Sequence, residues 1–208
     1  MRTLIACEES QAVCLAFRAL GHEAYSADLQ PCSGGHPEWH LEGDVFDVID
    51  QDWDMMVAHP TCTRLTNAGV RWLYEDGAPV PEMWDAMRAG RDFFMRFLGP
   101  ETNHIPKIVI ENPIPHCHAM LPPYSQCIQP WMFGDNYSKA TCLWLRGLPP
   151  LVPEVLTRPD NIEHACHMEP PGPDRAKNRS KTYPGIANAL ALQYGTVWIP
   201  ELTLGSNL

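Results

Sequence analysis

The sequence predicts an α/β fold in which a mostly parallel β-sheet carries helices on both faces. Short apolar segments with strand character alternate with segments of helical periodicity along most of the chain. Polar and reactive residues follow the ends of the predicted strands, where open α/β sheets bind their ligands. With 208 residues the chain has the length of one domain, and it contains no internal repeat.

The chain begins with a predicted strand, a helix and a second strand. A strand is expected at residues 2–6, with its short apolar part at 3–6. A helix follows for which Ser10 is the expected N-cap and Gly21 the stop, with apolar residues at helical spacing between them. Residues 22–28 read as the second strand, which ends in a carboxylate.

The next segment supplies a third buried strand and a polar loop. A short extended stretch ends at residues 42–44, and a brief helix is expected at 45–49. Residues 54–58 are expected to form the next strand, and after Asp54 this segment is apolar, which is typical of a strand buried on both faces. They lead directly into a loop at 59–69 that is rich in hydroxyl and amide side chains.

The rest of the chain contains two more strands and two helices. Residues 81–98 show the longest helical pattern, with aromatic residues expected in the core. Strands are predicted at 107–110 and 141–145, and a closing helix at 185–195. We therefore expect a single domain over 1–208 with a proline-rich loop insertion at about 146–182.

Composition limits the class of protein. Fifteen Lys and Arg against 25 Asp and Glu give a net charge of −10, which argues against a large footprint on duplex DNA. The eight cysteines form no CxxC pair, and the N-terminus does not resemble a signal peptide. Because no apolar run approaches a membrane span, we expect a cytoplasmic protein with reduced cysteines and no membrane partner.

Cys62 is the candidate nucleophile. Free cysteine is among the most buried residue types, so a small buried hydrophobe is one interpretation of this residue. Its position in a polar loop after a strand, with Glu111 at the end of another strand, favours a catalytic thiol.

Three carboxylates stand at predicted strand ends. Glu111 follows a strand of pure hydrocarbon, and it is expected to be a buried acid with a raised pKa that shares a proton with a ring nitrogen. The alternative is a carboxylate that caps the next turn. Asp28 and Asp44 are candidates for binding ribose hydroxyls, although solvated turn carboxylates look the same in sequence.

Five segments in order resemble motifs of the DNA cytosine-5 methyltransferases. The family's Pro-Pro-Cys loop, Glu-Asn-Val, Tyr-Gly, Gln-x-Arg-x-Arg strand and closing Ile-Gly-Asn-Ala-Val are similar to these parts of the chain: 59–69, 111–113, 133–134, 137–145 and 186–190. Residues 7–12 then correspond to the cofactor loop. The chain most resembles short phage-borne relatives that lack a target recognition domain, which would place it in a host cytoplasm.

The resemblance implies a Rossmann-like class I S-adenosylmethionine-dependent methyltransferase fold. It also implies transfer of a methyl group to carbon 5 of cytosine through a covalent adduct with Cys62, without a metal. The implied catalytic residues are Cys62, Glu111, Asn112 and Thr141. The implied cofactor-binding residues are Cys7, Glu8, Glu9, Asp28, Asp44, His59, Pro60 and Asn188.

The chain departs from the family at several positions. Glu9, Gln11 and Ala12 replace glycines of the cofactor loop, which restricts close approach of the backbone to a ligand. Thr61 replaces the second proline before the nucleophile. Thr141 stands where the family has an arginine that orients the cytosine, and Arg64 and Arg71 are the candidates to replace it.

The interval between the last strand and the closing helix bears on the substrate. It is too short to hold a domain that reads a duplex. The interval contains a basic run at residues 175–181, which is either a solvated loop or a clamp for a phosphate. The expected substrate is therefore a cytidine nucleotide such as dCMP, with cytosine in DNA as the alternative. The candidate substrate-binding residues are Thr61, Arg64, Asn67, Lys139, Arg175, Arg179, Ser180 and Lys181.

Two interpretations that assign the chain to another class of protein stay open. The first is a binding or decoy protein that keeps the fold without turnover, which the altered cofactor loop and Thr141 favour. The second is a zinc site with ligands from 164–167 and 116–118, although these residues lack a standard ligand spacing. The sequence does not predict an oligomeric state.

Overall fold

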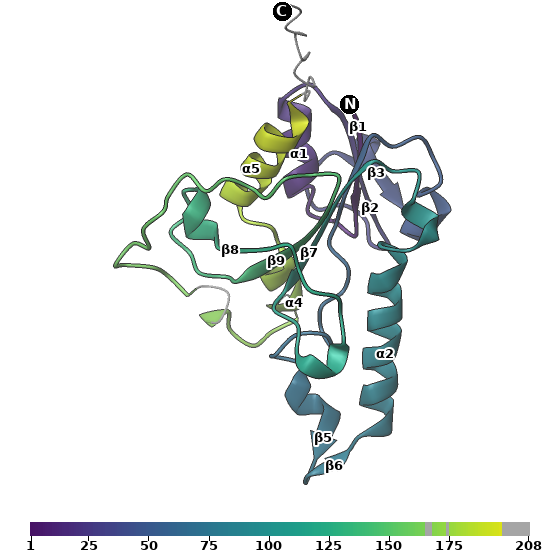
Figure 1. The fold of residues 1–208 in the computed structure, drawn as a ribbon, viewed down its shortest axis with the longest axis vertical. Helices are drawn as coiled ribbons and strands as arrows, with labels where there is room; N and C mark the ends of the chain where they lie inside the picture. The colour runs from purple at the N-terminus through teal and green to yellow at the C-terminus, as the bar shows by residue number, and fades with distance from the viewer. Residues whose placement is uncertain (165–167, 174, 197–208) are drawn as a thin grey trace, which may run out of the picture.

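The computed structural model describes residues 1–164, 168–173 and 175–196, and this part of the chain forms a seven-stranded sheet (Figure 1). The strand order across the sheet is β3-β2-β1-β4-β7-β9-β8. In chain order the strands are β1 (Arg2–Ala6), β2 (Glu23–Asp28), β3 (His40–Glu42), β4 (Met55–Ala58), β7 (Lys107–Pro113), β8 (Gln126–Ile128) and β9 (Thr141–Arg146). A separate hairpin joins β5 (Tyr74–Glu75) to β6 (Ala78–Pro79).

The sheet is mostly parallel, as the sequence predicts. Strands β3, β2, β1, β4 and β7 pair in parallel, and β9 runs antiparallel to both β7 and β8. The chain winds outward from β1 in both directions, so the strand order reverses between β1 and β4. In doubly wound sheets such a reversal is where a ligand-binding crevice opens at the carboxyl ends of the strands.

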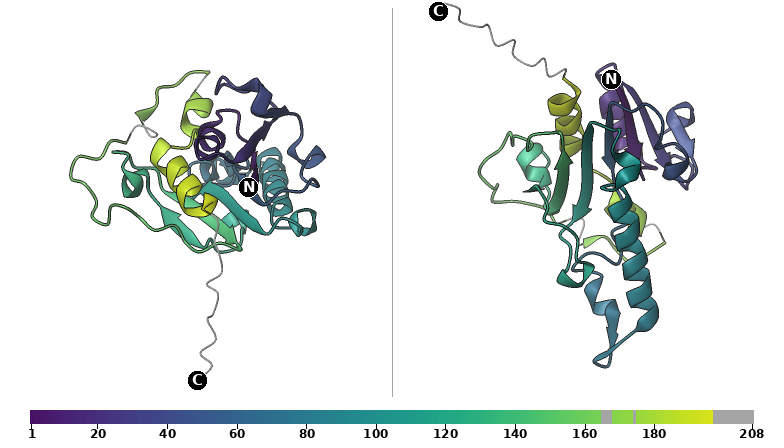
Figure 2. Two further views of the ribbon diagram at one scale, coloured as in Figure 1. Left: turned by 90° about the horizontal axis from the view of Figure 1, so that it is seen from above. Right: turned by 45° about the vertical axis from the view of Figure 1, so that its right-hand side comes forward.

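Helices cover both faces of the sheet (Figures 1 and 2). Helices α1 (Ala12–Ala19) and α5 (Pro184–Gly195) contact each other on one face, and α2 (Pro81–Arg96) packs on the other. Strand side chains alternate accordingly. Leu4 of β1 joins the core under α2, whereas Ile5 joins the core under α1 and α5. The fold is therefore a Rossmann-like α/β fold.

The register of the central strands sets the level of the residues that follow them. Ala6 pairs with Ala58, and Ala58 pairs with Ile110. The next residues along these strands, Cys7, His59 and Glu111, consequently lie at one level of the carboxyl edge. The amide of His59 donates to the carbonyl of Ala6 at 2.9 Å, which extends the ladder by one residue.

The expected N-cap of the first helix is wrong. Gln11 occupies the cap position with a positive φ of 59°, and it makes no capping hydrogen bond. The carboxylate of Glu8 instead accepts from the first-turn amides of Val13 at 2.7 Å and Cys14 at 3.2 Å. A buried glutamate at the end of β1 therefore satisfies amides that Ser10 was expected to cap.

Other elements differ in length or were not predicted. The brief helix expected at 45–49 is a 3-10 turn over Val45–Asp47, with Asp44 as its cap. β7 continues through Pro113, so Glu111 and Asn112 belong to the strand. β8 and the β5–β6 hairpin were missed, and α4 (Arg175–Ser180) forms within the stretch predicted as loop. In the described part of the chain, no helix is long and apolar enough to span a bilayer.

Candidate active site

His59 and Glu111 form the centre of the candidate site. His59 follows β4 and Glu111 lies in β7, so the parallel pairing of these strands brings together residues 52 positions apart. The Nδ1 atom of His59 lies 3.2 Å from Oε2 of Glu111, and each side chain is about 10% exposed. The other ring nitrogen, Nε2, is buried without a hydrogen-bond partner.

Glu111 is not the raised-pKa acid that the sequence predicts. Burial by itself raises the pKa of this carboxyl group. The hydrogen bond from His59, the charge of Lys139 and the hydroxyl of Thr141 outweigh that effect, and the pKa of Glu111 lies below its usual value. Near neutral pH Glu111 is therefore an ionised hydrogen-bond acceptor.

The loop that carries Cys62 is tied to β7 and the segment after it. The Asn112 side-chain amide donates to the carbonyl of Pro60 at 2.9 Å. The backbone amide of His116 donates to the carbonyl of Leu65 at 2.9 Å, and its ring Nε2 lies 2.8 Å from the carbonyl of Arg64. These contacts hold the loop on both sides of Cys62.

Cys62 is half-buried beside Glu111. Burial, followed by the negative charge of Glu111, raises the pKa of the Cys62 thiol, and the positive charges of Lys139 and Arg179 act in the opposite direction. The thiol is consequently protonated near neutral pH. The pKa of this thiol therefore depends on the balance between one carboxylate and two cations.

Helix α4 is joined to the carboxyl edge of the sheet by two lysines. Nζ of Lys139 lies 3.3 Å from the carbonyl of Lys181 and 3.5 Å from that of Ser180. Nζ of Lys177 lies 3.5 Å from the Glu9 carboxylate. Arg179 is on the same helix, and its Nε atom is buried without a hydrogen-bond partner. The helix thus links the loop after β1 to the segment before β9.

Not all of the basic run is free to hold a phosphate. Nε of Arg175 donates to the carbonyl of Glu169 at 2.8 Å, and Lys177 pairs with Glu9. Ser180 donates its hydroxyl back to the carbonyl of Lys177 at 2.8 Å. Arg179 is the member whose charge acts on Cys62.

Three predicted cofactor residues meet at the ends of β1, β2 and β3. Cys7 has a positive φ of 59° at the sharp turn after β1. Burial, with added repulsion from Asp28 and Asp44, raises the pKa of its thiol to about 12. Each aspartate uses one carboxylate oxygen on a backbone amide, Asp28 on Gln30 and Asp44 on Phe46, both at 3.0 Å.

The two glutamates of the cofactor loop differ in what surrounds them. Glu8 is buried against the amides of α1, and burial raises its pKa while the nearby His59 opposes the shift. Both carboxylate oxygens of Glu9 are buried without a hydrogen-bond partner, and Lys177 supplies the neighbouring charge. Glu9 is therefore the one of the pair with acceptors left for a ligand.

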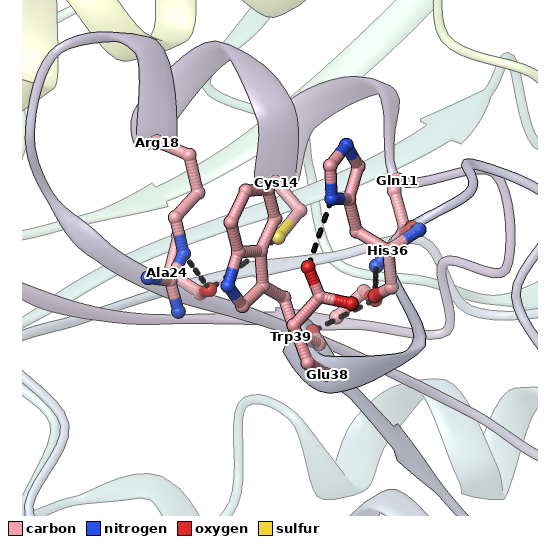
Figure 3. Close-up of polar contacts among 8 residues, drawn as sticks. Gln11, Cys14, Arg18, Ala24, His36, Glu38 and Trp39 are labelled. Atoms are coloured by element: carbon pink, nitrogen blue, oxygen red, sulfur yellow. Dashed lines mark hydrogen bonds and ion pairs between the residues drawn. The ribbon is translucent and has the colours of Figure 1, made fainter.

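Gln11 has a structural role that sequence reasoning missed (Figure 3). Its Nε2 donates to the carbonyl of His36 at 2.8 Å, and its Oε1 accepts from the His36 amide at 3.1 Å. The His36 ring stacks on Trp39 at 4.1 Å between centroids, and the Arg18 guanidinium lies 4.7 Å from the Trp39 ring centre. A Cβ atom on Gly34 would lie 2.5 Å from Cβ of Gln11, so glycine is needed where this loop crosses.

Several predicted residues lie apart from this cluster. Asn188 is exposed on α5 and has no polar side-chain contact among the described residues. Thr61 and Asn67 are exposed on the Cys62 loop. Arg71 lies over the ring of its neighbour Trp72 at 4.6 Å. Arg64 is half-buried and contributes its carbonyl to the contact with His116.

The zinc alternative gains no support. Cys166 and His167 lie outside the described residues. Nδ1 of His164 lies 2.6 Å from the Ser138 hydroxyl, and His116 is engaged with Arg64. Among the residues that are described, no three His, Cys, Asp or Glu side chains are grouped as a metal site.

Comparison with known proteins gives weak likenesses. No family model and no curated protein matches the chain. Among solved structures, one match is a prophage-encoded E. coli protein named for DNA modification methyltransferase activity, at 10% identity, a TM-score of 0.43 and coverage of 70% of this chain and 46% of that one. Two others are structures of MtNAS, one with MTA and tNA and one a mutant with S-adenosylmethionine.

The MtNAS matches have identities of 9% and 12% and TM-scores of 0.38 and 0.36. They cover 71% of this chain and 54% and 55% of theirs, so the chain spans about half the length of the structures it matches. At this level the likenesses carry no argument about activity.

Proposed function

We propose that this chain is an S-adenosylmethionine-dependent methyltransferase of a single domain that methylates carbon 5 of cytosine in a free nucleotide such as dCMP. The resemblance of its motifs to the cytosine-5 methyltransferases motivates the proposal. The observation that carries it is the placement of the Cys62 loop, which follows β4, against the neighbouring parallel strand β7, where Asn112 donates to the carbonyl of Pro60 at 2.9 Å and the charge of Glu111 raises the pKa of the thiol.

The residues after β1, β2 and β3 fit the cofactor. The sulfonium centre is cationic, and Glu9 offers a buried carboxylate whose oxygens have no hydrogen-bond partner, although Lys177 forms an ion pair with Oε2 at 3.5 Å. Asp28 and Asp44 each keep one oxygen free of the backbone contacts described above, which suits ribose hydroxyls. When bound, S-adenosylmethionine supplies an electrophilic methyl group.

Cys62 performs the covalent step. Carbon 5 of cytosine is a poor nucleophile until a thiolate adds to carbon 6 and converts the ring to an enamine. The positive charges of Lys139 and Arg179 favour the thiolate, and Asn112 fixes the loop through Pro60. Glu111 accepts from the exocyclic amine and orients the ring. After methyl transfer, loss of the carbon 5 proton lets the sulfur leave and restores aromaticity.

The arrangement of the basic residues favours a small substrate. Arg175 and Lys177 are engaged within the chain, which leaves few cations to follow a phosphate backbone. The segment before α5 contributes the short helix α4, and this helix carries Arg179 toward Cys62. A single phosphate group matches that supply of charge better than a polymer does.

Methyl transfer from labelled S-adenosylmethionine tests the proposal. Wild type, Cys62→Ala and Glu111→Gln would each receive dCMP, dCTP, single-stranded DNA or duplex DNA. Exposed Cys127→Ala is the matched cysteine control. We expect label at carbon 5 of dCMP with wild type and the control, and none with Cys62→Ala. Label on DNA alone would overturn the nucleotide assignment, and cofactor binding without any transfer would favour a decoy.

A further inference from the structure

The His59–Glu111 pair has the geometry of a shared proton site. The ring nitrogen and the carboxylate oxygen are 3.2 Å apart, and both side chains are about 10% exposed, so little water competes for the contact. Nε2 of His59 is buried and has no partner. The resemblance implied a cofactor contact for His59, but its polar side-chain contact in the described structure is with Glu111.

We propose that His59 and Glu111 share one proton, and that His59 supplies it to Glu111 when Cys62 adds to the cytosine ring. His59 is then a positioning residue that acts through Glu111. This inference rests on the proposed function and deepens it, because it identifies the source of the proton that the ring nitrogen N3 needs.

Glu111 requires such a source. Despite burial, the pKa of Glu111 lies below its usual value because His59, Lys139 and Thr141 stabilise the carboxylate. An ionised carboxylate accepts hydrogen bonds but has no proton to give N3. Histidine is the side chain whose ordinary pKa, about 6.5, allows it to release a proton near neutral pH.

The groups facing the pair come from the ends of two strands, β1 and β9. Glu8, after β1, is close enough to His59 for the charge of His59 to lower the pKa of Glu8 against the effect of burial. Lys139 and Thr141, before and in β9, face Glu111. Two carboxylates therefore lie near the His59 ring, and the charge of Lys139 favours the ionised form of Glu111.

The proton balance closes with water as the other partner. The Cys62 thiol gives its proton to water, and as the sulfur bonds to carbon 6, ring electrons move onto N3. N3 takes a proton from Glu111, and Glu111 takes one from Nδ1 of His59. Once the methyl group is on carbon 5 and its proton has gone to water, the sulfur leaves. The proton on N3 then returns through Glu111 to His59.

The first test compares pH profiles of kcat for wild type and His59→Asn. The asparagine amide can take the place of the Nδ1 donor, so a purely structural contact with Glu111 would survive. We expect His59→Asn to lower kcat by roughly 100-fold, as loss of acid–base catalysis does. The variant should also lose the part of the pH profile of kcat that reflects ionisation of a histidine. His104→Gln, which alters a remote ring bonded to the Ile49 carbonyl, should behave as wild type. A wild-type rate and profile for His59→Asn would overturn the inference.

The second test needs no turnover. NMR titration of the His59 ring in wild type and Glu111→Gln should show a lower histidine pKa in the variant, because a carboxylate that stabilises the cation is gone. An unchanged His59 titration would overturn the shared proton. If the titration shifts but wild type methylates no cytosine substrate, the shared proton stands and the proposed function fails. If methylation occurs and the titration is unchanged, this inference alone fails.

Discussion

The side-chain amide of Asn112 donates to the carbonyl of Pro60 at 2.9 Å and so fastens the loop of Cys62 to strand β7. Asn112 is buried, and its Oδ1 atom has no hydrogen-bond partner. The same side chain thus fixes the Cys62 loop and leaves one buried acceptor without a partner.

Asn112→Ala should lower both stability and methyl transfer. The substitution leaves the buried carbonyl of Pro60 without its donor, which costs about 1–3 kcal/mol in the free energy of unfolding. Chemical denaturation measures that loss, and the transfer assay measures the effect on the loop. Asn136→Ala is the control, because Asn136 makes a similar bond to the Asn161 carbonyl at 2.7 Å at an exposed site. Equal losses for the two variants would contradict this role of Asn112.

Glu8→Ala should destabilise the chain by about 1–2 kcal/mol, the usual cost of removing a helix cap. Its carboxylate accepts hydrogen bonds from the backbone amides of Val13 and Cys14 at the start of α1. Ser10→Ala should have little effect, because the Ser10 hydroxyl is 3.5 Å from the Ala12 amide. Thermal unfolding of the two variants tests the assignment, which a larger loss for Ser10→Ala would reverse.

Cys62 should react slowly with iodoacetamide at neutral pH and faster as the pH rises. Burial and the charge of Glu111 raise the pKa of its thiol, so the thiolate fraction is small. Glu111→Gln removes that charge and should speed alkylation of Cys62, whereas Lys139→Met should slow it. Peptide mass spectrometry follows the residue, with exposed Cys117 as the internal reference. Slower labelling in Glu111→Gln would contradict the electrostatic account.

Glu111 should contribute to the pH dependence of stability. The folded-state pKa of Glu111 lies below the unfolded value of about 4.3. Its contribution to the free energy of unfolding is therefore complete above the unfolded pKa and is lost as the pH falls through the folded pKa. The difference in free energy of unfolding between wild type and Glu111→Gln should therefore shrink between neutral and acidic pH. Denaturant titrations along this range provide the measurement, and a pH-independent difference would be inconsistent with the lowered pKa.

The central strands could be predicted because each is a continuous apolar run. Residues 55–58 and 108–110 are buried on both faces of the sheet, and that environment selects hydrocarbon side chains regardless of detail. β8 has three residues with polar neighbours, so no periodicity marks it. α4 is six residues long in a proline-rich stretch, and its position depends on Lys139 and Lys177.

The sequence predicted where the candidate site lies in the sheet, but it did not predict the contacts between its side chains. Strand ends located Cys62 and Glu111, since parallel strands present their carboxyl ends at one edge. The contact of His59 with Glu111 depends on the register of Ala58 with Ile110, which the sequence does not specify. The capping of α1 by Glu8 depends on the turn at Cys7 and Gln11, where non-glycine residues adopt positive φ.

The most direct measurement is mass spectrometry of the protein after incubation with S-adenosylmethionine and a 5-fluoro analogue of dCMP. Fluorine at carbon 5 cannot leave as a cation as a proton does, so the covalent intermediate should accumulate. The account predicts an adduct of the methylated nucleotide on the peptide containing Cys62, absent in Cys62→Ala. Turnover of unmodified dCMP without an adduct, or an adduct on another cysteine, would contradict it.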